Sequence, residues 1–181
     1  MIETENLILR RFKKEDYEDV FEYLHEPQVH CFECLKLNTL KDAKKELKRR
    51  VKSNEINFAI VLKRENKVIG EISATDHELQ ERFTLGLAWM LNPKYQGHGY
   101  MFEAALGFID YLFKETNLHR LYAYTEDYNK VSQHLLEKLG MRNEGLFKDF
   151  VSFVDDENGN PIYENTYQYA ILRDEWLEKH R

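Results

Sequence analysis

Between residues 56 and 125 the hydrophobic residues change their spacing twice, which limits the folds open to the chain. Three β-rich runs, INFAIVLK, VIGEISATD and FTLGLAWML, are separated only by polar breaks at 64–67 and 77–80. Such runs predict an antiparallel meander. Apolar residues then recur at helical spacing from Met101 to Phe113, and the β-rich run LYAYT follows. Strand, helix and strand in this order predict a βαβ unit whose two strands lie parallel in one sheet.

The residues before the meander predict a short strand and two helices. Leu7 and Leu9 indicate the strand, and Pro27 ends the first helix. The apolar stripe of that helix consists of Tyr17, Val20, Phe21 and Leu24. The second helix begins at Thr39, which forms a capping-box pattern with Asp42. Its expected inward residues are Leu40, Ala43, Leu47 and Val51. Its basic segment KKELKRR is interpreted as a solvated face.

The residues after the βαβ unit predict another helix and a terminal hairpin. The helix spans about Asn129 to Leu139, and Gly140 is expected to end it. Its expected inward residues are Val131, Leu135, Leu136 and Leu139. The runs GLFKDFVSFV and IYENTYQYAIL flank DDENGNP, whose Asn-Gly pair predicts a long hairpin. No Pro/Gly/Ser-rich linker divides the 181 residues, so we predict one α/β domain over residues 1–181.

The composition argues against two classes of function. A formal charge of −6 and a pI near 5.7 are unlike the basic character of proteins that bind nucleic-acid phosphates. No apolar run approaches the roughly 20 residues that cross a bilayer, and the N-terminal MIETENLILRRF lacks the apolar core of a signal peptide. We therefore expect a cytoplasmic protein that binds neither nucleic acid nor membrane.

The motif HCFEC contains His30, Cys31 and Cys34 and raises the question of a metal or redox site. A zinc site needs about four ligands, and no second Cys pair or His-x3-His motif supplies the missing ones. A thioredoxin-like motif opens a helix after a strand, whereas this motif follows a helical run and falls in a predicted loop. We interpret the cysteines as ordinary loop residues and predict no metal, with redox chemistry as the alternative.

The segment Gln96-Gly97-His98-Gly99-Tyr100 lies where the third β-rich run meets the following helix. A helix N-terminus leaves about four backbone N–H groups unpaired and carries a positive dipole end, so it attracts anions. Glycines lack the Cβ atoms that would keep a pyrophosphate from those amides, although a plain turn also uses them. A Walker loop would need Gly-Lys-Ser/Thr here, and a dinucleotide-binding motif would need a small residue at Phe102. The segment therefore matches neither of these phosphate-binding loops.

The order of these elements resembles that of the GNAT superfamily of N-acetyltransferases. In that family a Gln/Arg-x-x-Gly-x-Gly/Ala loop binds the pyrophosphate of acetyl-coenzyme A (acetyl-CoA). Gln96 and Gly99 match the loop, and Met101 occupies its final small position. Four further segments are similar to the branch of ribosomal-protein N-terminal acetyltransferases: ETENLILRRFKKEDYEDVFEYL, YQGHGYMFEA with Glu103, Asn129-x-x-Ser132 followed by LLEKLGMRNEG, and AILRDEW.

The resemblance implies a mixed, mostly antiparallel sheet flanked by helices, with a central parallel pair splayed around acetyl-CoA. It implies that the amine attacks the thioester directly in a ternary complex, without a metal or an acyl-enzyme. The implied acetyl-CoA contacts are Leu91, Gln96, Gly97, His98, Gly99, Tyr100, Asn129 and Ser132. Ser132 is also implied to protonate the departing thiolate. The branch often has an acid at the position of Gly86. Because this chain has none there, the candidate bases are Glu103, Glu71 and water.

The resemblance also implies an amine as the acceptor, and a protein N-terminus is the favoured one. At pH 7 an α-amine with a pKa near 7.7 to 8.0 is roughly one-tenth neutral, whereas a lysine amine near 10.4 is neutral in about one molecule in a few thousand. The alternatives are a small amine (an aminoglycoside, a polyamine or an amino acid) and a coenzyme-A-binding sensor without turnover. A homodimer is compatible with the resemblance.

Overall fold

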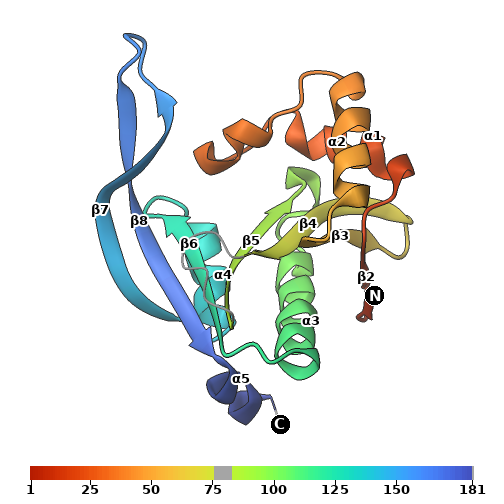
Figure 1. Ribbon diagram of the computed structural model, residues 1–181, viewed down its shortest axis with the longest axis vertical. Coiled ribbons are helices and arrows are strands. Elements are labelled where there is room, and N and C mark those ends of the chain that lie inside the picture. The colour runs from red at the N-terminus through yellow and green to blue at the C-terminus, as the bar shows by residue number, and fades with distance from the viewer. Residues whose placement is uncertain (76–82, 181) are drawn as a thin grey trace.

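The computed structural model describes residues 1–75 and 83–180 and places its strands in one sheet of order β1-β2-β3-β4-β5-β6-β8-β7 (Figure 1). The strands are β1 (Ile2–Glu3), β2 (Leu7–Arg10), β3 (Ile56–Leu62), β4 (Lys67–Thr75), β5 (Thr84–Leu91), β6 (Arg120–Glu126), β7 (Arg142–Asp155) and β8 (Pro161–Leu172). The β3–β5 meander is antiparallel and β5 pairs with β6 in parallel, so both predictions are confirmed. The polar break predicted at 77–80 lies outside the described residues.

Helices cover both faces of the sheet. The α-helices are α1 (Tyr17–Leu24), α2 (Leu40–Lys52), α3 (Tyr100–Glu115), α4 (Lys130–Lys138) and α5 (Arg173–Lys179), and the 3-10 turns are η1 (Lys14–Asp16), η2 (His30–Leu35) and η3 (Pro93–Tyr95). Apolar residues of α3, α4 and α5 pack on one face around Phe108 and Trp176. Residues of α1 and α2 pack on the other face around Leu24 and Leu47.

The parallel strands β5 and β6 pair only at their beginnings. Their register joins Thr84–Gly86 to Arg120–Tyr122 and, within the described residues, goes no further. Beyond it, β6 keeps its pairing with β8 to Glu126, and β5 keeps its pairing with β4 to Leu91. The two strands therefore diverge toward their carboxyl ends, as the resemblance implied.

Three apolar residues that were expected to face inward are exposed, and these predictions were wrong. The exposed fractions are 46% for Leu40, 40% for Val51 and 77% for Val131. In α2 the buried stripe is narrower than predicted and consists of Ala43, Leu47 and Arg50. In α4 the residues that face the sheet are Gln133 and Leu136, which leaves Val131 on the opposite side of the first turn.

Two local predictions also need correction, and two are confirmed. Arg50, assigned to a solvated basic face, is buried because it pairs with a carboxylate inside the protein. The segment HCFEC forms part of the 3-10 turn η2 and is not an irregular loop. The capping box of Thr39 and Asp42 is confirmed, and Gly140 ends α4 with a positive φ of 85°.

Candidate functional site

The glycine loop lies between the end of β5 and the start of α3. Gly97 and Gly99 have φ angles of 79° and 82°, in the left-handed region that side chains disfavour. A Cβ atom added to either residue would meet no described chain atom within 4 Å. Backbone conformation therefore requires the glycines, and their amides remain accessible from solvent.

Contacts with the rest of the protein hold this loop in place. The buried Asn92 donates its N–H to the Ile69 carbonyl at 2.8 Å, and its Oδ1 accepts from Lys94 N at 3.1 Å. The His98 ring stacks on Tyr100, with centroids 5.7 Å apart and planes at 12°. Met101, which occupies the position where the family pattern has a small residue, is buried in the core below α3. Its bulk therefore points into the core.

The first turn of α3 offers unpaired backbone N–H groups. Glu103 N–H donates to the Gly99 carbonyl at 3.0 Å, so the amides that precede it have no acceptor within the helix. The helix dipole adds partial positive charge at the same end. Four consecutive residues at this end, Gln96, Gly97, His98 and Gly99, are exposed. The arrangement suits an anion with several oxygens, such as a pyrophosphate.

The predicted contacts that follow β6 lie at the same edge of the sheet. Because β5 and β6 are parallel, Leu91 at the end of β5 and α4 after β6 belong to one edge. Asn129 caps α4, since its Oδ1 accepts from Ser132 N at 3.2 Å. Ser132 is half-buried in the first turn of α4. The glycine loop, Leu91, Asn129 and Ser132 thus all lie at the edge of the sheet where the carboxyl ends of the diverging strands are found.

Glu103, predicted as a candidate base, is bound to the turn between β1 and β2. Its Oε1 accepts from Thr4 Oγ1 at 2.5 Å and from Asn6 N at 2.7 Å, and its Oε2 accepts from Asn6 Nδ2 at 3.0 Å. Although partial burial by itself would raise the pKa of Glu103, these hydrogen bonds lower it. The carboxylate therefore joins α3 to the edge of the sheet, away from β5 and β6.

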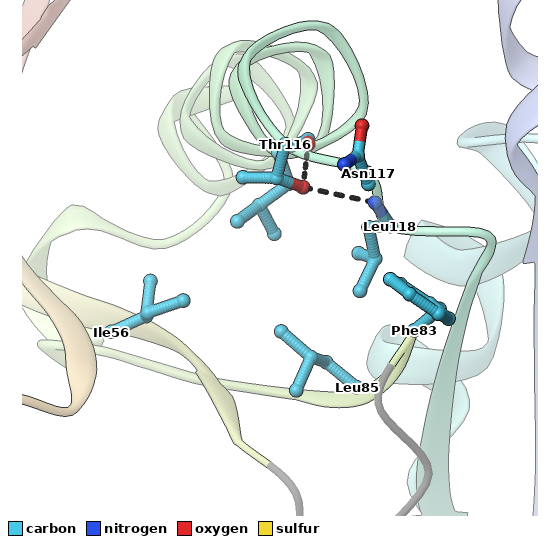
Figure 2. Close-up of a pocket in the computed structure, with 7 residues that line it drawn as sticks. Ile56, Phe83, Leu85, Thr116, Asn117 and Leu118 are labelled. Carbon is cyan, nitrogen blue, oxygen red and sulfur yellow. Dashed lines mark hydrogen bonds between the residues drawn. The ribbon is translucent and has the colours of Figure 1, made fainter.

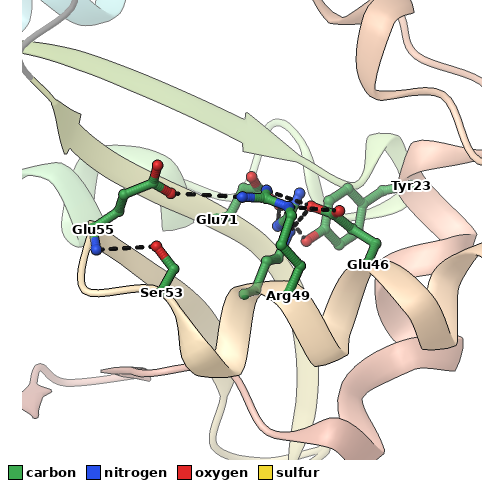
Figure 3. Close-up of polar contacts among 7 residues, drawn as sticks. Tyr23, Glu46, Arg49, Ser53, Glu55 and Glu71 are labelled. Atoms are coloured by element: carbon green, nitrogen blue, oxygen red, sulfur yellow. Dashed lines mark hydrogen bonds and ion pairs between the residues drawn. The ribbon is translucent and has the colours of Figure 1, made fainter.

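Glu71, the second candidate base, lies below α1 and α2 in a buried polar network (Figure 3). Its Oε2 forms an ion pair with Arg50 and accepts from Tyr23 Oη at 2.8 Å. Burial would lower the pKa of Arg50, but the carboxylates of Glu71 and Glu46 hold it above its ordinary value. A carboxylate that neutralises a buried arginine is poorly suited to take a proton from a substrate.

The position at which the branch often has an acid is Gly86, which lies against an aromatic ring of β6. Gly86 lies beside Tyr122 in the parallel register, and a Cβ atom on it would lie 2.9 Å from the Tyr122 ring. An acidic side chain at this position would displace the ring. A side chain at position 86 and the Tyr122 ring would therefore compete for the same space.

Two buried carboxylates near Asn129 were not predicted as site residues. Glu126 is the last residue of β6 and Glu164 lies on β8, and they are 5% and 7% exposed. Asn129 Nδ2 donates to Glu126 Oε2 at 3.3 Å, and Tyr128 Oη donates to Glu164 Oε2 at 3.2 Å. No spacing pattern joins these residues in the sequence, so only the fold brings them together.

A separate apolar pocket of about 200 Å³ lies at the opposite end of the strand pair (Figure 2). It is lined by Ile56, Phe83, Leu85, Leu112, Thr116, Asn117 and Leu118. Thr116 Oγ1 is already used there, since it donates to Leu112 O at 2.6 Å and accepts from Leu118 N at 3.1 Å. Because the pocket borders the beginnings of β5 and β6, it is not part of the site described above.

Three further observations concern metal ligands, thiols and helix length. Within 1–75 and 83–180, no group of three His, Cys, Asp or Glu side chains is arranged to hold a metal ion. Cys31 and Cys34 are both free thiols. No helix in this part of the chain combines the length and apolar character needed to cross a membrane.

Comparison with known proteins identifies relatives of this chain. A family model described as an acetyltransferase (GNAT) domain matches residues 6–142. The N-acetyltransferase YnaD of Bacillus subtilis is 34% identical over 97% of this chain and 98% of its own. The crystal structure of a GNAT-family acetyltransferase from Bacillus anthracis has a TM-score of 0.82 and 34% identity, covering 96% and 99% of the two chains. The ribosomal-protein-S5-alanine acetyltransferase of Vibrio fischeri has a TM-score of 0.75 and 26% identity, covering 96% and 97%.

Proposed function

Since the chain belongs to the GNAT family of acetyltransferases, we propose that it moves the acetyl group of acetyl-CoA to the α-amine of a protein N-terminus. GNAT enzymes use acetyl-CoA and act on amines, so the donor and the reaction class follow from membership. The similarity to a ribosomal-protein-S5-alanine acetyltransferase supports a protein N-terminus as the acceptor. The alternative acceptor is a small amine, namely an aminoglycoside, a polyamine or an amino acid.

One arrangement carries the proposal for the coenzyme site. The strands β5 and β6 diverge beyond Gly86 and Tyr122, and the loop 96–100 lies at the same edge as Asn129 and Ser132. In the proposed complex, the loop amides bind the pyrophosphate. The pantetheine arm then runs between the two strands. It forms hydrogen bonds with backbone groups of β5 beyond Gly86, as an added strand would.

In the proposed chemistry the neutral amine attacks the thioester carbonyl, so that the C–N bond forms as the C–S bond breaks. The proton that the nitrogen loses passes to water. A backbone N–H near Leu91 stabilises the oxyanion, and Ser132 donates its proton to the departing thiolate. Positioning of both substrates supplies much of the rate. Of the predicted bases, Glu103 and Glu71 are both engaged in hydrogen bonds or ion pairs within the protein, which favours structural roles for them.

Thiol release with acetyl-CoA and a panel of amines tests this function. We expect the fastest release with peptides that carry a free N-terminal alanine. The matched control is the same peptide with a blocked N-terminus and an internal lysine, which should react at least tenfold more slowly. If an aminoglycoside, spermidine or a free amino acid reacted faster, that amine and not a protein N-terminus would be the acceptor. Tight acetyl-CoA binding without turnover above hydrolysis would favour a coenzyme-A-binding sensor.

A further inference from the structure

A cluster of polar side chains outside the coenzyme site lies at the carboxyl end of β6. We define the acidic cluster as Glu126, Glu164 and Thr166. Glu126 and Thr166 face each other in the register of β6 and β8, and Glu164 is two residues before Thr166 on β8. Since side chains alternate along a strand, all three lie on the same face of the sheet. This is the face that α1, η2 and α2 cover.

The segment η2 closes over this cluster from the other side. His30 Nδ1 contacts Glu164 Oε1, and Figure 1 shows the segment between α1 and α2 reaching toward the β7–β8 hairpin. The adjacent Cys31 thiol has a raised pKa, first because it is buried and then because Glu126 and Glu164 lie near it. Both carboxylates therefore lie close to the same thiol of η2.

Among the described residues, no Lys or Arg forms an ion pair with the acidic cluster. In the ion pairs of the described residues, Glu164 has only His30 as a partner, and Glu126 has none. The neighbouring Lys130 directs its Nζ to the Asp127 carbonyl at 2.8 Å. By contrast, the buried Glu71 is paired with Arg50. Two buried carboxylates without Lys or Arg are costly unless a cation joins them.

Thr166 adds a buried hydroxyl group to the two carboxylates. It is 4% exposed, and its Oγ1 has no hydrogen-bond partner among the described residues. Its position directly opposite Glu126 places its side chain beside that of Glu126 on the same face of the sheet. Buried hydroxyls are normally hydrogen-bonded, so this oxygen is available to a ligand that donates.

An aromatic surface adjoins the acidic cluster. Phe147 lies opposite Thr166 in the register of β7 and β8, on the same sheet face. Its ring centroid is 4.9 Å from that of Phe150, and Tyr124 lies 6.3 Å from Phe147 and 5.8 Å from Phe150. Both phenylalanines are partly open to solvent. Aromatic faces stabilise cations and also pack against apolar groups.

The acidic cluster is connected to the predicted proton donor by a short chain of contacts. Glu126 accepts from Asn129 at 3.3 Å, and Asn129 accepts from Ser132 N at 3.2 Å. A cation bound to Glu126 would therefore lie beside the residues that are proposed to contact the thioester end of acetyl-CoA.

We propose that Glu126, Glu164 and Thr166 bind the ammonium group of the acceptor, and that Tyr124, Phe147 and Phe150 select an acceptor whose amine adjoins an apolar group. An ammonium group has three donors, which matches the three side chains of the acidic cluster. The bound ammonium loses one proton before the neutral amine attacks the thioester. This inference rests on the proposed function, and it narrows the substrate class to primary amines with an apolar body, including N-termini with an apolar first residue.

Binding and kinetics with 2-phenylethylamine test the inference. For Glu126→Gln and Glu164→Gln we expect the KM for this amine to rise at least tenfold, while the KM for acetyl-CoA stays within twofold. Thr166→Val, which keeps the shape, should raise the amine KM about threefold to tenfold. The matched control is Glu157→Gln, an exposed glutamate in the hairpin turn, which should change neither KM.

A turnover-independent measurement separates this inference from the proposed function. Calorimetric titration of coenzyme-A-bound protein should show 2-phenylethylamine binding at least tenfold more weakly to either Gln variant than to the wild type. The neutral isostere 2-phenylethanol should bind equally to all three. Circular dichroism melting of each variant verifies folding.

The outcomes are distinguishable. If amine binding needs Glu126 and Glu164 but no amine is turned over, the result would support ammonium binding by the acidic cluster and overturn the proposed function. Turnover with an amine KM that neither Gln variant alters would overturn the cluster and leave the function intact. If 2-phenylethylamine failed to bind the wild type, or if spermidine bound better, the proposal that the aromatic residues select an amine with an apolar group would be overturned.

Discussion

At the scale of single residues, Gly97 and Gly99 combine a conformational requirement with an open surface. Their positive φ angles exclude most side chains, and no described chain atom approaches the missing Cβ positions. Gly159 in the hairpin turn has the same two properties, with a φ of 80°. The two turns differ in position, since Gly99 begins a helix at the diverging strands and Gly159 lies at the tip of β7 and β8.

Gly99→Ala should therefore raise the KM for acetyl-CoA at least tenfold, because the strained turn moves the amides that are proposed to bind pyrophosphate. The forced left-handed conformation should also cost about 1 to 2 kcal/mol of stability. Gly159→Ala is the matched control, with a similar loss of stability and an unchanged KM. Steady-state kinetics and thermal melting measure both effects, and an unchanged KM for Gly99→Ala would show that the pyrophosphate binds elsewhere.

Glu103→Gln should lower the free energy of unfolding by about 1 to 2 kcal/mol, since it weakens charge-assisted hydrogen bonds from Thr4 and Asn6. The lowered pKa of Glu103 stabilises the fold above the ordinary value near 4.5, and that stabilisation disappears as the pH falls through the lowered value. The difference from wild type should therefore be largest at pH 7 and shrink below about pH 4.5.

Chemical denaturation across pH measures this difference, with Glu115→Gln on the exposed side of the same helix as the control. The pH profile of kcat should be unchanged. A loss of about 100-fold or more in kcat with normal stability would instead establish Glu103 as the general base.

Ser132→Ala should lower kcat about 100-fold if its hydroxyl protonates the thiolate, with little change in either KM. Asn129 caps α4 through the backbone N–H of residue 132, so the substitution leaves the cap intact. Ser53→Ala, distant from the site at the end of α2, is the control. A change in kcat smaller than twofold would assign thiolate protonation to water or to another side chain.

At the scale of elements, α2 shows how a helix can bury a charge that its sequence pattern assigns to solvent. The helix has an ordinary apolar pair in Ala43 and Leu47, and Arg50 extends that stripe toward Glu71 on β4. Glu46 on the preceding turn also accepts from Arg50 Nε at 2.8 Å. The carboxylates of α2 and β4 thus make burial of this arginine favourable.

Arg50→Met should lower the free energy of unfolding by about 3 to 5 kcal/mol, because it leaves Glu71 buried without its cation. The double variant Arg50→Met/Glu71→Leu should recover part of that loss, since an apolar pair can replace a buried ion pair, although the buried Tyr23 hydroxyl then loses its acceptor. Lys48→Met on the exposed side of α2 is the control. Urea denaturation measures all three variants, and a double variant as unstable as the single one would contradict the pairing argument.

At the scale of the whole molecule, the sheet organises the candidate site through one incomplete pairing. The strands β5 and β6 are held by β4 and β8 on their outer sides, while their own pairing stops at Gly86 and Tyr122. The loop before α3 and the first turn of α4 therefore lie at one edge of the sheet. A ligand that enters between these strands would contact both halves of the sheet.

Acetyl-CoA should accordingly stabilise the whole fold. At 100 times its Kd it should add about 2.7 kcal/mol to the free energy of unfolding. For a chain of this size that corresponds to a rise in Tm of about 5 to 10 °C. Coenzyme A should act similarly, whereas pantetheine, which lacks the pyrophosphate, should have little effect. Equal stabilisation by pantetheine would contradict the role of the glycine loop.

Several features follow from the sequence alone because they depend on local physics. The spacing of hydrophobic residues predicted the meander, the βαβ unit and the terminal hairpin. Helices and strands each place the residues of one face at a fixed spacing, so a buried face is visible in the sequence. The positive φ angles at Gly97, Gly99 and Gly140 agree with positions where only glycine is free of a Cβ penalty. The resemblance to GNAT enzymes also came from the sequence, because several short segments similar to that family occur in the same order along the chain.

Tertiary structure decided which charged groups are engaged and which are open to a ligand. The contacts of Glu103 with Thr4 and Asn6, and of Glu71 with Arg50, join residues far apart in the chain. Glu126 and Glu164 come together because β6 and β8 are neighbours and η2 packs over them. Local patterns cannot encode such partners, since an ionisable side chain is engaged or free according to what long-range packing places beside it.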